Sequence, residues 1–230
     1  MTISSDNVAK WHRWLDVVEK DIGWVLRQKA ISDAFVRVHN THLDEITKNG
    51  GEDFCRSVWA WYGVFAALGV RRHVDWSGDP DNRSLLNFLK DLKTIASEFT
   101  FAFYLELFPP TANGADPPVP WQEAGFRQFT DDDEVQPEST LSVSKLQADI
   151  EALAEIKGKT EALIDKVYAH LDDGGAHLAL GSGLPVFGDF DGGLATIERI
   201  ALKYLGLFNR GKVSLLPQGG RAISIPLAVG

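Results

Sequence analysis

The residues best suited to chemistry lie near position 170, at the end of a long helical pattern. Lys166 and His170 are four residues apart and Asp173 follows one turn later, so the three side chains can share one helix face. An imidazole can exchange a proton with a ribose 2′-hydroxyl or a leaving oxygen at neutral pH, while a fixed cation stabilises charge on phosphorus. The spacing therefore indicates a face that could act on a phosphodiester.

A second polar cluster, Arg71-Arg72-His73-Val74-Asp75, closes an apolar helical segment. Cations at a helix C-terminus commonly offset the macrodipole and bind the last carbonyl oxygens, which would explain the arginines without any further function. That interpretation leaves Asp75 unexplained. An aspartate one turn after an arginine could instead hold its guanidinium in place, as a supporting residue does for a working cation.

The Lys-Val-Tyr-Ala-His-Leu-Asp stretch at residues 166–172 resembles the signature of HEPN domains. The earlier cluster at residues 71–75, followed by Ser84-Leu85-Leu86, resembles the AbiU-like abortive-infection branch of that superfamily. With the all-helical order, the resemblance covers most of residues 10–208. It implies a helical bundle that dimerises and, in active members, cuts RNA without a metal through paired Arg-x(4–6)-His motifs at the dimer interface.

The sequence departs from that motif at its arginine. Leu, Ile and Asp occupy residues 163–165, where the arginine should stand, and Lys166 is one step too close to His170. A lysine lacks the guanidinium fork, so it would not present the same paired donors to a phosphate. Either Arg71 or Arg72 supplies the cation from another helix, or the ribonuclease activity has been lost.

The site that the resemblance implies combines side chains from both clusters. His170 would be the general acid or base, and Tyr168 and Asp172 would orient its partners. The expected catalytic residues are His170, Lys166, Arg71 and Arg72, with Tyr168, Asp172 and Asp75 in support.

Other candidate sites carry weaker patterns. Arg37 and His42 show the Arg-x4-His spacing, but such a match is expected by chance, and His42 falls on an apolar stripe that predicts a core histidine. Cys55 has apolar neighbours, which predicts a buried and unreactive thiol. The Gly181-Ser182-Gly183 segment lacks the Lys-Ser or Lys-Thr of a phosphate-binding loop.

Two groups of possible metal ligands also lack a recognised spacing, so we expect neither a metal nor a cofactor. These groups are His39, His42 and Glu45, and His73, Asp75, His170 and Asp172.

The composition is that of an ordinary globular protein, with 230 residues, 44% hydrophobic and 24% charged. The net charge of -9 argues against broad, non-specific binding to nucleic acid. A single cysteine excludes an intramolecular disulfide framework. No apolar run approaches the length of a membrane span, and the first residues lack the apolar core of a secretory signal. We therefore expect a cytoplasmic protein without a membrane contact.

Helical periodicity organises most of the chain. It predicts an all-α, up-and-down bundle of five or six helices. Together with the resemblance, this implies a single HEPN-like domain over residues 1–208. Residues 109–140, which hold six of the ten prolines, are predicted to be a long inserted surface loop. The tail at residues 209–230 is predicted to form a small β-hairpin. The predicted helical segments are 11–26 and 31–46, as one bent helix or a hairpin, then 53–74, 85–99, 143–171 and 194–208.

Three functions remain open. The first is a HEPN-like protein of prokaryotic defence or toxin–antitoxin type, acting as a metal-independent endoribonuclease with a degenerate motif, with RNA as substrate and an antitoxin or partner protein. The second is a catalytically inactive module for protein interaction or dimerisation. The third is a metal-dependent hydrolase. Tryptophans on the first and third helical segments could form an apolar patch of the kind that becomes a homodimer interface, although core packing is their simpler use.

Overall fold

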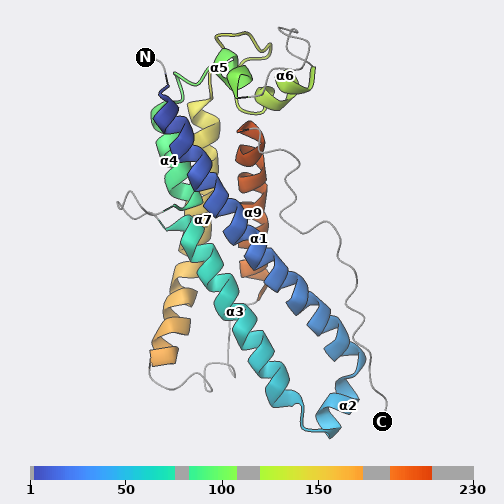
Figure 1. Cartoon of the computed structure of the whole chain (residues 1–230). Helices are drawn as coiled ribbons and strands as arrows, with labels where there is room; N and C mark the ends of the chain where they lie inside the picture. The colour runs from blue at the N-terminus through green and yellow to red at the C-terminus, as the bar shows by residue number, and fades with distance from the viewer. Residues whose placement is uncertain (1–2, 76–82, 108–119, 173–186, 209–230) are drawn as a thin grey trace.

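The computed structural model describes residues 3–75, 83–107, 120–172 and 187–208, and gives only the backbone of residues 120–121, 159–172 and 187–189. This part of the chain forms eight helices and no strand, so the predicted all-α bundle is confirmed (Figure 1). Three of the helices are short, which is why they exceed the expected five or six. The tail at residues 209–230 lies outside the described residues. The helices are α1 (Ser5–Thr41), α2 (Leu43–Lys48), α3 (Glu52–Val74), α4 (Leu85–Thr94), α5 (Phe101–Glu106), α6 (Pro120–Arg127), α7 (Val143–Asp172) and α9 (Phe187–Leu207).

The first two predicted segments form one continuous helix, α1. It begins at Ser4, whose side chain accepts a hydrogen bond from the Asn7 backbone N–H and so caps the first turn. The short helix α2 then leads to Gly50, which adopts a left-handed φ of 70°. The sequence Asn49-Gly50-Gly51 is typical of a helix stop, and the chain reverses there into α3.

The core lies where α3 packs against α1, α7 and α9. The first half of α1 and α9 each contribute a buried apolar stripe. In α7 the stripe is buried from Leu146 to Ile156, whereas Val143 is exposed. Gly69 marks the crossing of α1 and α3, because a Cβ there would lie 2.5 Å from Val25 Cγ2. Among the fully buried side chains are Trp11, Leu15, Ile22, Phe88, Leu153, Ile197 and Tyr204.

The predicted surface insertion at residues 109–140 is wrong for residues 120–130, whereas residues 131–138 form the irregular, mostly exposed loop that was expected. Residues 120–127 form α6, and Phe126 and Phe129 are buried in the common core. The backbone of Thr140 forms an isolated bridge with Thr100, which ties the segment to the start of α5. Proline content suggested a loop, but the aromatic residues after it supply enough apolar surface to fold the segment onto the bundle.

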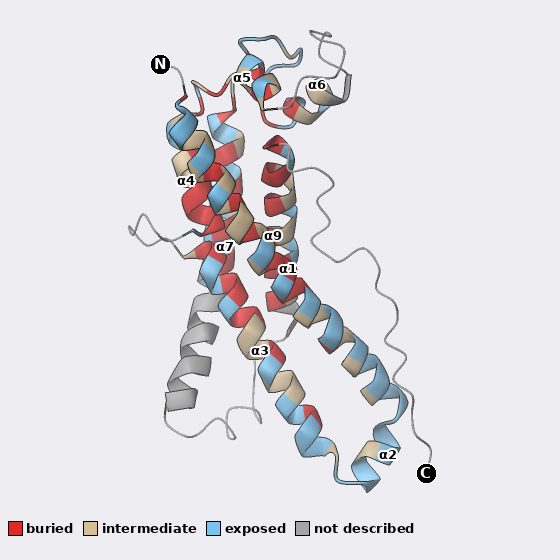
Figure 2. Ribbon diagram, viewed as in Figure 1, coloured by how far each residue is buried: buried red, intermediate tan, exposed pale blue. Residues whose placement is uncertain are grey.

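The second half of α1, α2 and the first half of α3 project away from the bundle as a helical hairpin, which we call the arm (residues 27–65) (Figure 1). Most of its surface is exposed or half-buried (Figure 2). Apolar residues run along the whole of α3, a pattern typical of a centrally packed helix, but its first half projects from the bundle and is mostly exposed or half-buried. Within the described residues, no helix is both long and apolar enough to cross a membrane.

Candidate functional site

The predicted cluster at the end of α3 forms a network of ion pairs. Arg71 Nε lies 2.9 Å from Asp75 Oδ2, and Lys157 Nζ of α7 lies 2.9 Å from Asp75 Oδ1. Burial alone would raise the pKa of Asp75, but the hydrogen bonds from Lys157 and Arg71 outweigh it and hold the pKa below its usual value. The expectation that Asp75 holds a guanidinium is met by Arg71, and Lys157 is a partner that the sequence did not indicate.

Arg72 forms an ion pair with a residue of a different helix. Its Nε lies 2.9 Å from Asp21 Oδ2 on α1, as an ion pair without hydrogen-bond geometry. Burial raises the pKa of Asp21, and the nearby charge of Arg72 opposes that shift only in part. Arg71 and Arg72 thus each face a carboxylate, which offsets the positive charge that a phosphate would need.

His73 lies between these arginines and the core. Its side chain is 1% exposed, and neither ring nitrogen has a hydrogen-bond partner among the described residues. Burial, assisted by the charge of Arg72, lowers the pKa of His73 to about 3. This imidazole is neutral at physiological pH and is not a proton shuttle there.

The other half of the predicted site falls on the last turns of α7. The side chains of Lys166, Tyr168, His170 and Asp172 lie outside the described residues, so their roles stay predictions. The backbone of His170 is 13 residues beyond Lys157 on α7, which corresponds to about 20 Å along a helix axis. The structure therefore brings Arg71 together with Asp75 and Lys157, but it does not bring these residues to His170 within one chain.

The histidines of the arm do not form a metal site. In the described part of the chain, no three His, Cys, Asp or Glu side chains are placed to hold a metal ion. His42 is half-exposed and pairs with Glu45 at 3.5 Å, so its prediction as a core histidine is wrong. It follows the last turn of α1, beyond the reach of the bundle. His39 packs against Trp59, with ring centroids 4.8 Å apart. Cys55 is buried as expected.

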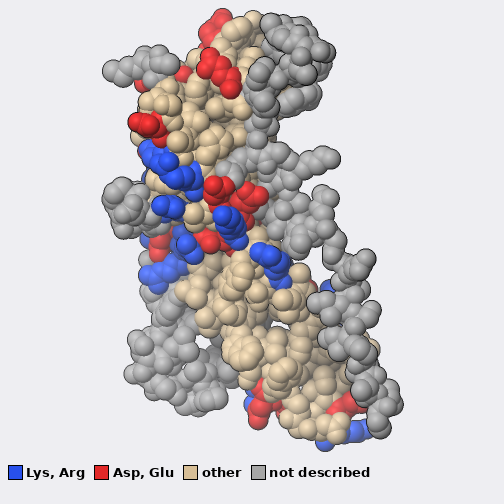
Figure 3. All heavy atoms as spheres, viewed as in Figure 1, with Lys and Arg blue, Asp and Glu red and all other residues tan. Residues whose placement is uncertain are grey.

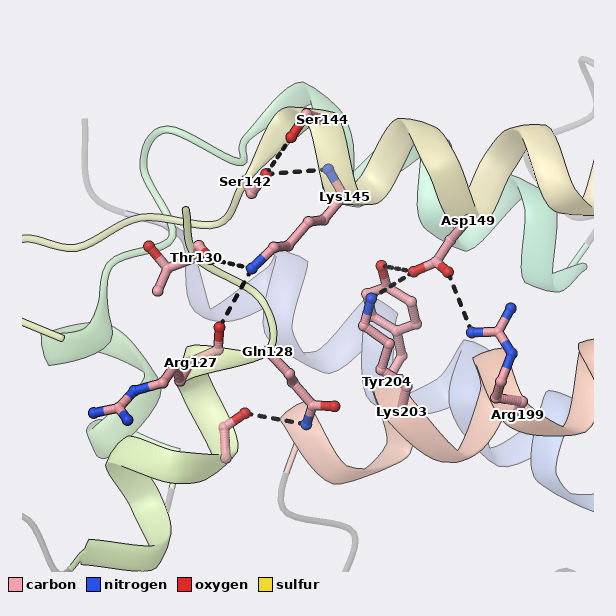
Figure 4. Close-up of polar contacts among 11 residues, drawn as sticks. Arg127, Gln128, Thr130, Ser142, Ser144, Lys145, Asp149, Arg199, Lys203 and Tyr204 are labelled. Carbon is pink, nitrogen blue, oxygen red and sulfur yellow. Dashed lines mark hydrogen bonds and ion pairs between the residues drawn. The ribbon is translucent and has the colours of Figure 1, made fainter. Parts of the chain in front are cut away.

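A second polar cluster, which the sequence did not reveal, joins α7 to α9 (Figure 4). Asp149 is buried and accepts hydrogen bonds from Lys203 Nζ at 2.6 Å and from the Tyr204 hydroxyl at 2.9 Å. Arg199 Nη1 lies 3.7 Å from its other oxygen. Burial and the charge of Asp149 raise the pKa of Tyr204, so the phenol stays protonated and donates. Both carboxylate oxygens already have partners, and the cluster fastens two helices together.

The most unusual surface of the described structure is on the arm. The described structure has nine exposed large apolar side chains, and eight of them belong to α1, α2 or α3. Six of them form two rows with seven-residue spacing, a period that keeps side chains on one face of a helix. We call these six residues the arm face: Trp24, Ile31 and Val38 on α1, and Phe54, Trp61 and Leu68 on α3. Trp24 and Leu68 lie just beyond the base of the arm, and the other four lie on it.

The two rows lie on the same side of the arm. The rings of Trp24 and Phe65 are 5.0 Å apart, and the rings of Phe35 and Phe54 are 6.1 Å apart, so aromatic contacts join α1 to α3 along both rows. Trp61 and Phe54 are each 64% exposed. The seven-residue spacing was visible in the sequence, but only the structure shows that this face has no covering helix in the described part of the chain.

Comparison of the chain with models of protein families, with curated proteins and with solved structures found no match.

Proposed function

We propose that this protein is a helical interaction module that binds a protein partner through the arm face. The observation that carries the proposal is the exposure of two aligned apolar rows on a projecting hairpin. Contiguous apolar patches of this kind are rare on monomeric proteins and commonly mark contact sites. Large aromatic side chains such as Trp61 are also the residues that most often dominate binding energy.

The base of the arm is held rigidly, which favours binding. The Tyr62 hydroxyl donates to Asp191 Oδ1 of α9 at 2.6 Å, and Lys29 Nζ of α1 lies 3.1 Å from Asp191 Oδ2. These contacts tie both helices of the arm to the bundle. A preorganised surface loses less conformational entropy on association than a mobile one does.

Site-specific photo-cross-linking in cells tests the proposal. We expect Trp61→p-benzoylphenylalanine to give one defined covalent adduct, because the benzophenone would lie inside the interface. Val143→p-benzoylphenylalanine is the matched control, since Val143 is also apolar and exposed but lies on α7. No adduct from position 61, or the same adducts from both positions, would contradict the proposal.

The alternatives have less structural support. The metal-independent ribonuclease and the defence or toxin–antitoxin role implied by the HEPN resemblance stay predictions, because the His170 side chain lies outside the described residues. Arg71 and Arg72, which it would need, face Asp75 and Asp21. A metal-dependent hydrolase is not supported by any ligand cluster among the described residues.

A further inference from the structure

The arm face carries enough apolar surface for a stable interface. From their exposed fractions, its six side chains leave on the order of 600 Å² in contact with solvent. An interface of standard size buries about 800 Å² on each partner, and a little over half of that is apolar. The arm face with a polar rim therefore matches one half of such an interface.

We propose that the occupant of the arm face is a second copy of this chain, which packs its own arm face against it in an antiparallel, two-fold arrangement. This inference rests on the proposed function and specifies its partner. The two-fold axis would lie in the interface and run across the arm. It would place each helix against its own equivalent, α1 on α1 and α3 on α3.

The spacing of the two rows fits this symmetry. In an antiparallel pair, the outer residues of a row exchange places while its central residue meets its own equivalent. Ile31 is central between Trp24 and Val38, and Trp61 is central between Phe54 and Leu68, with seven residues on either side in each case. The complex would be a four-helix arrangement with Ile31 and Trp61 near the axis, packed as in antiparallel coiled coils.

The charge of the arm's tip selects the antiparallel direction. At the base, charges of both signs flank the rows: Lys20 lies four residues before Trp24, and Arg72, four residues after Leu68, is paired with Asp21. Figure 3 shows charged side chains at the tip and where the arm joins the bundle, with other residue types between them.

The tip carries a net negative charge. Residues 43–56 contain four carboxylates, Asp44, Glu45, Glu52 and Asp53, against the two cations Lys48 and Arg56. A parallel pair would set the two acidic tips together, whereas an antiparallel pair keeps them apart. Like charges brought together at an interface are unfavourable, so the charge of the tip favours the antiparallel orientation.

Sedimentation velocity and light scattering on the full chain test the dimer. We expect the wild type to have twice the 25.4 kDa mass of one chain at micromolar concentration. Trp61→Lys should weaken the dimer by about 100-fold or more, because it removes a central aromatic contact from both sides of the axis. Ile31→Lys should act in the same direction. Val143→Lys, the exposed control on α7, should leave the dimer unchanged, and circular dichroism would verify that each variant folds.

Several outcomes would overturn the second copy as occupant. A wild type that is monomeric at all concentrations would do so, and so would a Trp61→Lys variant that dimerises like the wild type. If the benzophenone at position 61 then links to a different protein, the interaction function stands and only the second copy fails. A link from position 61 to residues 209–230 of the same chain would overturn both proposals.

Cysteine cross-linking tests the direction of the pair. Under mild oxidation, Ile31→Cys should form a disulfide-linked dimer, because the two thiols meet near the axis. Asp44→Cys should stay monomeric on a non-reducing gel, since antiparallel arms separate the two tips by about 40 Å. The wild type, with only the buried Cys55, supplies the background. Linkage of Asp44→Cys, or none at Ile31→Cys, would contradict the antiparallel geometry.

Discussion

His73 lies on the buried side of α3 with neither ring nitrogen hydrogen-bonded to a described residue. Burial keeps its folded pKa at about 3, whereas an unfolded histidine titrates near 6.5. Below pH 6.5 the unfolded chain binds a proton that the folded chain does not. Above that pH, His73 costs the fold no protonation free energy, and this group lowers the free energy of unfolding progressively as the pH falls from 6.5 toward 3.

We expect His73→Leu to raise the free energy of unfolding by about 1 to 2 kcal/mol at pH 7, because it removes two buried polar atoms that lack partners. The difference in free energy of unfolding between the variant and the wild type should grow by about 2 kcal/mol at pH 5, because only the wild type must deprotonate an imidazole when it folds. Urea unfolding at both pH values measures the effect. His42→Leu, at a half-exposed histidine, is the control. A wild type and a His73→Leu variant that lose stability in parallel between pH 7 and pH 5 would contradict this account.

At the scale of elements, the contact between α7 and α9 depends on the buried carboxylate of Asp149. Asp149→Asn keeps the shape of the side chain but leaves Lys203 without its counter-charge in a mostly buried position. Breaking a buried pair from one side typically costs about 3 kcal/mol, so we expect a loss of that order in urea unfolding. Tyr204→Phe should cost only about 1 kcal/mol, because it removes one hydrogen bond.

The control for that measurement is Asp133→Asn, which removes an exposed carboxylate. It should change stability by less than about 0.5 kcal/mol. If Asp149→Asn were as stable as this control, the cluster would not hold α7 to α9.

The sequence predicted the helices well because hydrophobic periodicity and helix capping depend on residues that are close together in the sequence. Ser84, for example, directly precedes an apolar helical stretch, as a capping residue does, and it caps α4. The partners of a helix are set by lengths and packing instead. α1 has 37 residues and α9 has 21, so α9 spans only part of α1, and the rest of the apolar pattern projects as the arm. Ile31 and Phe54 therefore looked like core residues in the sequence and are exposed in the structure.

The candidate site was harder to predict than the fold. Asp75 was correctly expected to hold an arginine, because an i,i+4 pair lies within one helix. Lys157 and Asp21 come from α7 and α1, and no local pattern shows that they meet the end of α3. The same is true of Asp149 with Lys203 and Tyr204, which are more than fifty residues apart.

At the scale of the whole molecule, the charge favours binding of a protein partner over cleavage of RNA. The chain carries a net charge of -9, and Arg71 and Arg72 are each paired with a carboxylate. Binding to phosphates requires cations that can release counterions, and neither the overall charge nor these pairs favour it. We therefore expect total RNA and synthetic RNA to remain intact when incubated with the purified protein in chelator.

A gel of the RNA products decides the matter, with His170→Ala and His42→Ala run beside the wild type. Cleavage that survives chelation and disappears only in His170→Ala would establish a metal-independent ribonuclease and contradict our expectation. Loss in His42→Ala instead would assign the activity to Arg37 and His42 on the arm. If the wild type cleaved RNA, Trp61→Lys would show whether activity depends on the dimer, because a monomer that still cuts would place the chemistry within one bundle.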